Sequence, residues 1–219
     1  MKILNLYCGI GGNRKLWGDE HEITAVEIDV NIAKVYQNLF PNDRVIVADA
    51  HEYLLKHYKE FDFIWSSPPC PTHSKMNFAR EQKKYPDMAL YQEIVFLKSW
   101  FDGSYCVENV VPYYEPLITP SVVLGRHSFW SNFKILQKSF TNIDVTRSSP
   151  DLLFKERGID ISIFDIIKEI PENRSKHNRF DRRQMVRNMV NPDMANYILN
   201  QALNIQEPIQ EGLFKEDQK

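Results

Sequence analysis

A cysteine in a proline-rich turn and a glutamate further along the chain are the residues best suited to covalent chemistry. Cys70 lies in the run Ser-Pro-Pro-Cys-Pro, after a predicted strand over 62–66. Because proline fixes φ, the turn is stiff, and a cysteine among prolines is a poor core residue. Glu108 follows the next predicted strand, over 104–107. A thiolate that attacks carbon 6 of a pyrimidine, with acid help at nitrogen 3, makes carbon 5 nucleophilic. We therefore predict that Cys70 is a nucleophile and that Glu108 is its acid partner.

A second group of residues predicts a nucleoside pocket. A strand over 2–8 runs into the turn Tyr-Cys-Gly-Ile-Gly-Gly, whose glycines let the backbone approach a ligand closely. The spacing is neither that of a dinucleotide fingerprint nor that of a phosphate loop. Glu27 ends a strand over 22–28, where it can accept both ribose hydroxyls, and Asp49 follows a strand over 44–48, where it can accept from an adenine amino group. Together they describe an adenosine site without a phosphate loop, which S-adenosylmethionine requires.

The elements that position these residues alternate between strands and helices. Amphipathic helices are predicted over 30–39, 51–58 and 88–101, between the strands. This alternation is typical of βαβ units with a mostly parallel sheet, and ligands bind beyond the carboxyl ends of such strands. After about residue 135 the alternation fades, and a helix over 182–203, interrupted near Pro192, is predicted to end the domain.

Composition favours an ordinary globular protein. The chain has 219 residues, 43% hydrophobic and 26% charged, with a net charge of −2. No signal peptide and no membrane span are recognisable, so we expect no membrane partner. The three cysteines fit neither a disulfide framework nor a metal site, so we expect a cytoplasmic protein, from a bacterium or a phage-infected cell, without a bound metal.

The motifs resemble those of the cytosine-5 DNA methyltransferases, in the family's order and over nearly the whole chain. The segments that carry the resemblance are NLYCGIGGN, VEID, AD, PPC, ENV and, near the end, QMVRNMVNPDMA. The resemblance implies a Rossmann-like methyltransferase fold with S-adenosylmethionine as cofactor. It also implies a cofactor site made by Tyr7, Gly9, Ile10, Gly12, Glu27, Ile28, Asp49, Ala50, Pro69, Asn188 and Val190.

The same resemblance gives roles to the catalytic residues. Cys70 would attack carbon 6 of a cytosine flipped out of double-stranded DNA, Glu108 would engage nitrogen 3, and Arg126 would hold the base oxygen. Two departures stand out: Ser128 takes the place of a second arginine that the family commonly has, and Pro71 replaces the usual glutamine after the cysteine.

Contacts to DNA are expected from the loop after the cysteine and from a basic run before the last helix. The predicted contact residues are Ser74, Lys75, Arg80, Arg179 and Arg182. We divide the chain into a catalytic α/β domain (1–133), a reduced target-recognition segment (134–183), a helix that completes the domain (184–205) and a polar tail (206–219). Members of the family that this chain resembles usually insert a larger recognition domain, so we expect target specificity to be short, relaxed or supplied by a partner chain.

Three other functions stay open. Carbon-5 modification of cytosine in RNA or in a free nucleotide would suit the short recognition segment. A catalytically silent cofactor-binding protein is disfavoured because Cys70 and Glu108 occur together. Methylation at nitrogen normally uses a (D/N)PP(Y/F) motif after the fourth strand, where this chain has SPPC.

Overall fold

A seven-stranded sheet forms the centre of the molecule. The computed structural model describes residues 1–77, 84–140, 152, 155, 157–160, 162–163 and 182–205. The sheet order is β3-β2-β1-β4-β5-β7-β6, in which β7 runs antiparallel to β5 and to β6 and the other neighbours are parallel. The strands are β1 (Lys2–Leu6), β2 (Glu22–Glu27), β3 (Arg44–Val47), β4 (Phe63–Ser66), β5 (Ser104–Val110), β6 (Val122–Leu124) and β7 (His127–Ser131). The predicted α/β class with a mostly parallel sheet is confirmed.

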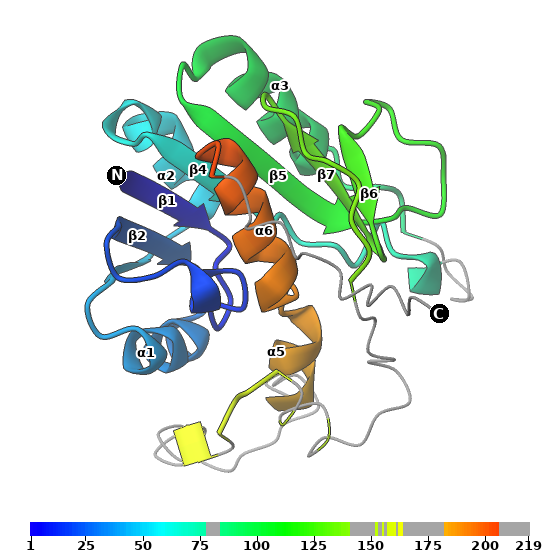
Figure 1. Cartoon of the computed structure of the whole chain (residues 1–219). Coiled ribbons are helices and arrows are strands. Elements are labelled where there is room, and N and C mark those ends of the chain that lie inside the picture. The colour runs from blue at the N-terminus through cyan, green and yellow to red at the C-terminus, as the bar shows by residue number, and fades with distance from the viewer. Residues whose placement is uncertain are drawn as a thin grey trace, which may run out of the picture.

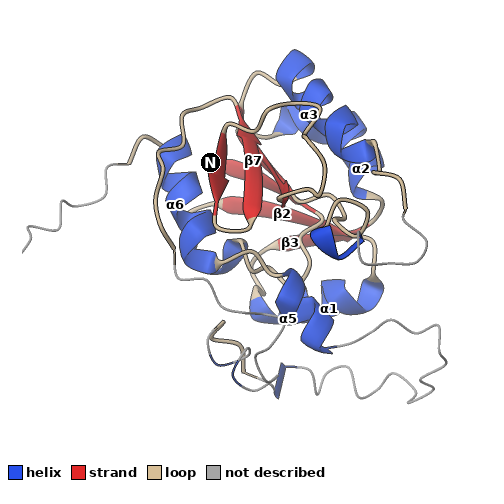
Figure 2. Cartoon of the chain, turned by 90° about the vertical axis from the view of Figure 1, so that its right-hand side faces the viewer, coloured by secondary structure: helices blue, strands red, loops and turns tan. Residues whose placement is uncertain are grey.

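Helices cover both faces of this sheet (Figures 1 and 2). The α-helices are α1 (Val30–Leu39), α2 (Ala50–His57), α3 (Ala89–Trp100), α5 (Arg182–Asn188) and α6 (Pro192–Ala202), and the short 3-10 turns are η1 (Arg14–Leu16), η2 (Tyr58–Glu60) and η3 (Lys75–Asn77). Figure 2 shows α6 on one side of the sheet and α2 and α3 on the other. After β1, the chain adds β2 and β3 on one side of this strand and then returns to add β4 and β5 on the other side. The strand order therefore reverses between β1 and β4. Ligands of open α/β sheets bind at such a reversal.

Alternating side chains on the strands make two cores. Ile3 and Trp65 face α6 and η1, whereas Leu4 and Ile64 face α2 and α3. Strands that are buried on both faces read as almost continuous apolar runs, which is why β1 and β4 are recognisable in the sequence.

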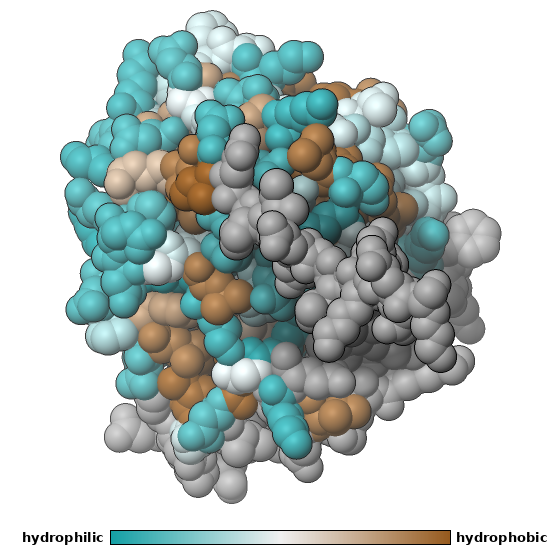
Figure 3. Space-filling view, viewed as in Figure 1, coloured by the Kyte–Doolittle hydropathy of each residue, from teal (hydrophilic) through white to brown (hydrophobic). Residues whose placement is uncertain are grey.

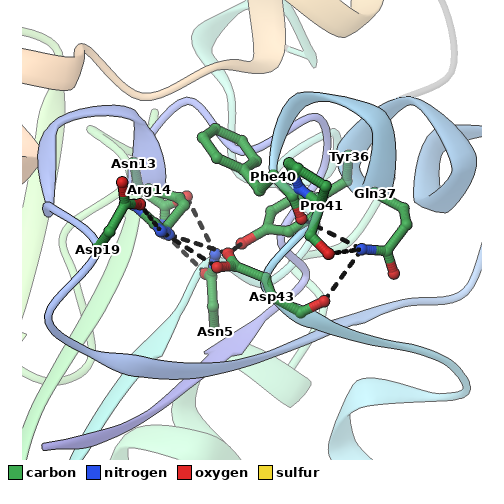
Figure 4. A network of polar contacts seen from close by, with 9 residues as sticks. All are labelled: Asn5, Asn13, Arg14, Asp19, Tyr36, Gln37, Phe40, Pro41 and Asp43. Atoms are coloured by element: carbon green, nitrogen blue, oxygen red, sulfur yellow. Dashed lines mark hydrogen bonds and ion pairs between the residues drawn. The ribbon is translucent and has the colours of Figure 1, made fainter.

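A buried polar network ties the segment after the first glycines to the start of β3 (Figure 4). Arg14 binds Asp43 through two hydrogen bonds, from Nε at 2.9 Å and from Nη2 at 3.1 Å, and the Tyr36 hydroxyl donates to the same carboxylate at 2.8 Å. Asn5 and Asn13 exchange hydrogen bonds beside this pair. The chain that leaves the glycine turn is therefore anchored to α1 and to the turn before β3.

One feature of the C-terminal half differs from the sequence prediction, and another agrees with it. The β6–β7 hairpin was not predicted; its turn contains Gly125 at φ 59°, a conformation that glycine adopts readily. The predicted interruption of the last helix near Pro192 is confirmed: α5 ends at Asn188 and α6 begins at Pro192. Asn191 caps α6 by accepting from the N–H groups of Asp193 and Met194, and Pro192 occupies its first turn.

The described surface is mixed in character. Figure 3 shows hydrophobic residues on this face as separate patches among hydrophilic ones. Within the described ranges, every helix is too short or too polar to cross a membrane. The predicted division into segments stays a prediction, since much of 134–183 and all of 206–219 lie outside the described residues.

Candidate active site

The two outer glycines of the turn after β1 have different surroundings. Gly9 has φ +54°, and a Cβ built on it would meet nothing within 4 Å. A Cβ on Gly12, in contrast, would lie 2.7 Å from the Cβ of Met189 and 2.9 Å from the carbonyl oxygen of Val190. Gly12 is therefore required for close packing of the segment between α5 and α6, whereas Gly9 borders open space that a ligand can use.

Glu27 joins this turn to the end of β2. Its carboxylate accepts the N–H of Gly9 at 3.1 Å and the N–H of Asp29 at 3.0 Å. Burial raises the pKa of the Glu27 carboxyl group, and these two N–H donors oppose that shift. Each carboxylate oxygen has a second lone pair, so further donors can still be accepted. The next residue, Ile28, is a large apolar side chain left 68% exposed.

The other predicted cofactor residues differ from one another in exposure and in their contacts. Asp49 is exposed and caps α2, because its Oδ1 accepts the N–H of Glu52 at 2.9 Å. Ala50 is the buried first residue of that helix. The side chain of Ile10 is buried in a cluster with residues of α1 and α5, so only its backbone can border the open space. Asn188 is the exposed last residue of α5, and Val190 is buried.

Beneath the turn lies a carboxylate that the sequence analysis did not single out. Glu93 of α3 is fully buried and accepts the hydroxyl hydrogens of Tyr7, at 2.5 Å, and of Ser66. The ring of His51 lies 3.5 Å from the same carboxylate, and the pKa of His51 is raised chiefly by this contact. Burial, followed by the Glu93 charge, raises the pKa of Tyr7. Glu93 thus joins the ends of β1 and β4. The sequence feature that could have revealed this buried carboxylate is a glutamate on the otherwise apolar helix face of Leu90, Ile94 and Leu97.

The turn that carries Cys70 is held from two sides. Asn109 of β5 donates its side-chain N–H to the carbonyl oxygen of Pro68 at 2.9 Å. At the tip of the turn, the carbonyl oxygen of Cys70 accepts the N–H groups of His73 at 3.0 Å and Ser74 at 3.1 Å. Pro68 is buried and Pro69 is exposed, while Cys70 is half-buried. The thiol is therefore fixed at the carboxyl end of β4.

Charges around the thiol connect the three predicted catalytic residues. Burial raises the pKa of Cys70 to about 11; the Glu108 charge adds to this shift, and the Arg126 charge opposes it. Cys70, Glu108 and Arg126 therefore lie within electrostatic range of one another. Cys8 and Cys106 are buried in the cores, where burial raises the pKa of each thiol.

Glu108 has a histidine partner that sequence reasoning missed. Its Oε1 is in hydrogen-bond contact with Nδ1 of His127 on β7, and both residues are 6% exposed. Nε of Arg126 donates to the other ring nitrogen, Nε2, at 3.2 Å, and Nη2 of Arg126 donates to the carbonyl oxygen of Arg187 at 3.0 Å. Ser128 is 1% exposed and pairs with Asn109, so it faces away from Glu108. The antiparallel register thus places His127, and not Ser128, beside the acid.

The predicted DNA-contact residues are only partly described. Ser74 is half-buried and forms an isolated antiparallel β-bridge with Pro112. Lys75 is exposed at the start of η3. Arg182 is the first residue of α5. Arg80 and Arg179 lie outside the described residues.

Comparison with solved structures agrees with this architecture. A mutant of DNMT2 from Spodoptera frugiperda is 15% identical with a TM-score of 0.51, and the match covers 92% of this chain and 99% of that one. The Entamoeba histolytica methyltransferase EhMeth is 11% identical with a TM-score of 0.50, over 94% of this chain and 99% of that one. At these identities the likeness shows the fold alone.

Sequence comparison is more specific about the family. No curated protein matches the chain. The family model described as C-5 cytosine-specific DNA methylase matches residues 1–110, which include the glycine turn, Glu27, Cys70 and Glu108. The chain belongs to the family of C-5 cytosine-specific DNA methylases.

Proposed function

We propose that the protein transfers a methyl group from S-adenosylmethionine to carbon 5 of cytosine in DNA, with Cys70 as the nucleophile. The observation that carries the proposal is the half-buried thiol at the end of β4, within range of the Glu108 carboxyl group and the Arg126 guanidinium. The glycine turn that borders open space follows the adjacent strand, β1. Membership in the family supports both the reaction and the modified carbon.

The residues around the glycine turn fit the cofactor. Open space at Gly9 leaves room for a ligand, the spare lone pairs of Glu27 suit ribose hydroxyls, and exposed Ile28 offers an apolar surface to an adenine ring. Asp49 keeps a second carboxylate oxygen beyond the one that caps α2, and we assign it to the adenine amino group. When bound, S-adenosylmethionine supplies an electrophilic methyl group.

The chain's own residues make carbon 5 reactive. The Cys70 thiol first gives its proton to water. The thiolate then forms a bond from Sγ to carbon 6 of the base, and the ring electrons shift so that nitrogen 3 takes a proton from the Glu108 carboxyl group. Arg126 holds the base oxygen. After methylation, water takes the proton from carbon 5, the C–H electrons re-form the double bond to carbon 6, and Sγ leaves as the thiolate. The proton on nitrogen 3 returns to Glu108, so Glu108 is restored as the acid and Cys70 is released as the reactive thiolate.

Access to the base requires that it leave the duplex. Flipping a base costs a few kcal/mol, and cationic contacts to the neighbouring phosphates can offset part of that cost. Exposed Lys75, five residues after Cys70 in the chain, suits such a contact. We assign the same role to Arg80, Arg179 and Arg182.

A covalent-trapping experiment tests the proposal. DNA that contains 5-fluorocytosine should form a denaturation-resistant adduct with the wild-type protein, since carbon 5 then has no proton to lose. Cys70→Ser should form no adduct and should still bind the cofactor, whereas Cys106→Ala, which removes a thiol buried in the core, should form the adduct. An adduct with Cys70→Ser would show that the nucleophile is another residue.

Bisulfite sequencing of plasmid DNA from cells that express the protein tests the substrate. Compared with cells that lack the protein, the DNA should gain methylated cytosines, in a short or relaxed sequence context, and the total RNA should gain none. Methylation of RNA alone would favour the RNA alternative. Cofactor binding without methylation of either nucleic acid would favour a catalytically silent protein.

A further inference from the structure

Within the part of the chain that the structure describes, the Glu108 carboxyl group is held by one ring nitrogen, Nδ1 of His127. In the β5–β7 pairing Glu108 lies opposite Phe129 and Val110 lies opposite His127, so all four side chains share one face of the sheet. From there the Nδ1 atom of His127 contacts Oε1 of Glu108. The His127 ring is itself stacked beside the Phe129 ring, with 6.3 Å between centroids and 29° between planes. A buried ring packed in this way has little freedom to turn.

Arg126 determines which nitrogen of His127 carries the proton. Nε of Arg126 lies 3.2 Å from Nε2 of the ring. A guanidinium group can only donate, so Nε2 must accept and must carry no proton. A neutral imidazole has one N–H, which then lies on Nδ1 and points at Oε1 of Glu108. Arg126 is fixed in turn by its hydrogen bond to the carbonyl oxygen of Arg187.

We propose that His127 is a positioning residue that selects the oxygen of Glu108 from which the base receives its proton; this role rests on the proposed function. A neutral carboxyl group can carry its proton on either oxygen and can rotate between the two arrangements. Because Nδ1–H donates to Oε1, that oxygen acts as the carbonyl-type acceptor, and the proton is left on Oε2. The carboxyl group is therefore oriented before the base arrives, which is the condition for efficient proton donation in the transition state.

Release of tritium from carbon 5 of cytosine is the appropriate measurement. Attack by Cys70 and proton donation by Glu108 make carbon 5 exchangeable without methyl transfer, so release from [5-³H]cytosine DNA reports on this step apart from the cofactor. His127→Leu keeps an apolar side chain in the core but removes the donor. His127→Asn places an amide N–H close to the position of Nδ1. Ser128→Ala is the matched control, since Ser128 is a buried neighbour on the opposite face.

We expect His127→Leu to slow tritium release about 10- to 100-fold, part of the 10²- to 10⁴-fold that general acid catalysis contributes. His127→Asn should recover most of the rate, and Ser128→Ala should match the wild type. The dissociation constant for S-adenosylmethionine should stay unchanged in all three, whereas a merely structural role would lower cofactor affinity together with the rate. Unchanged release in His127→Leu, or an equally slow His127→Asn, would overturn the proposal.

Nitrogen-15 NMR of the wild-type protein gives a test that depends on no variant. The His127 ring should show a protonated Nδ1 and an unprotonated Nε2, and a proton on Nε2 alone would overturn the proposal even if His127→Leu fails to fold. The release assay is run on RNA as well as on DNA. Release from RNA alone would refute the DNA substrate, and the His127 variants would then be compared on RNA.

Discussion

The buried ion pair between Arg14 and Asp43 offers a sharp test of how the cofactor side of the site is held. Arg14 begins η1, shortly after the glycine turn, and Asp43 directly precedes β3. Their side chains are 4% and 3% exposed and are joined by two hydrogen bonds (Figure 4). Asp19 binds the same guanidinium at 3.2 Å, but its side chain is 84% exposed. One cation thus has a buried partner and a solvated one.

Replacing each partner separately gives very different expectations. Asp43→Asn leaves a buried guanidinium without its buried anion, and loss of one member of a buried pair costs about 3–5 kcal/mol. In a chain of this size each kcal/mol lowers Tm by about 2–4 °C, so Tm should fall by about 6–20 °C. Asp19→Asn removes an exposed partner, which contributes at most about 1 kcal/mol, or about 4 °C.

Thermal unfolding followed by circular dichroism measures both variants under the same conditions. Added salt should reduce the effect of Asp19→Asn and leave that of Asp43→Asn nearly unchanged, because buried charges are screened least. The reasoning would be refuted if the two variants lost the same Tm, since the buried pair would then contribute no more than a surface one.

Three further predictions concern the site itself. Glu27→Gln should weaken binding of S-adenosylmethionine about 10- to 150-fold in calorimetry, because hydrogen bonds to a charged acceptor contribute roughly 1.5–3 kcal/mol. Glu22→Gln, at the exposed start of β2, is the control. An unchanged dissociation constant in Glu27→Gln would show that Glu27 does not bind the cofactor. The rate at which iodoacetamide alkylates Cys70 should rise about tenfold per pH unit toward pH 11, because only the thiolate reacts and the pKa of the thiol is raised. Arg126→Gln should move this pH profile to higher pH, because the Arg126 charge opposes the rise in pKa. A midpoint near pH 8 in the wild type would contradict the buried environment. Replacing Arg179, Arg182 and Arg183 with alanine tests their contacts to DNA. If all three contact phosphates, the slope of log K for DNA binding against log [salt] should become shallower by roughly two to three units. A lower Tm with an unchanged slope would mean instead that these arginines brace the C-terminal helices.

Most of the parallel part of the fold could be predicted from the sequence. Strands buried on both faces appear in the sequence as short apolar runs, whereas apolar residues in the helices between them recur every three to four positions. For this reason β1 to β5 and α1 to α3 were predicted close to their observed bounds. The same reasoning placed Cys70 and Glu108 just after two strands that prove to be neighbours, although β5 continues to Val110 and therefore contains Glu108. In parallel sheets, residues at successive strand ends meet at one edge even when they are far apart in the sequence.

The antiparallel edge could not be predicted in the same way. β6 has three residues and β7 has five, too few for a clear alternating pattern, and the signal available was the glycine of their turn. The partner of Glu108 depends on the register of that hairpin, which a shift of one residue would change. Sequence reasoning therefore considered Arg126 and Ser128 and passed over His127, although His127 is the residue that the register brings to the acid.

Glu93 shows a different limit, because it belongs to no motif and lies on the otherwise apolar buried face of α3. Its two carboxylate oxygens accept from Tyr7, at the end of β1, and from Ser66, at the end of β4. These strands are neighbours across the reversal of strand order, where the glycine turn and the Cys70 turn begin. A buried carboxylate is costly unless it is hydrogen-bonded, so its burial is maintained only while both strand ends keep their positions. The relative placement of the two turns is therefore coupled to a helix residue that lies in neither motif.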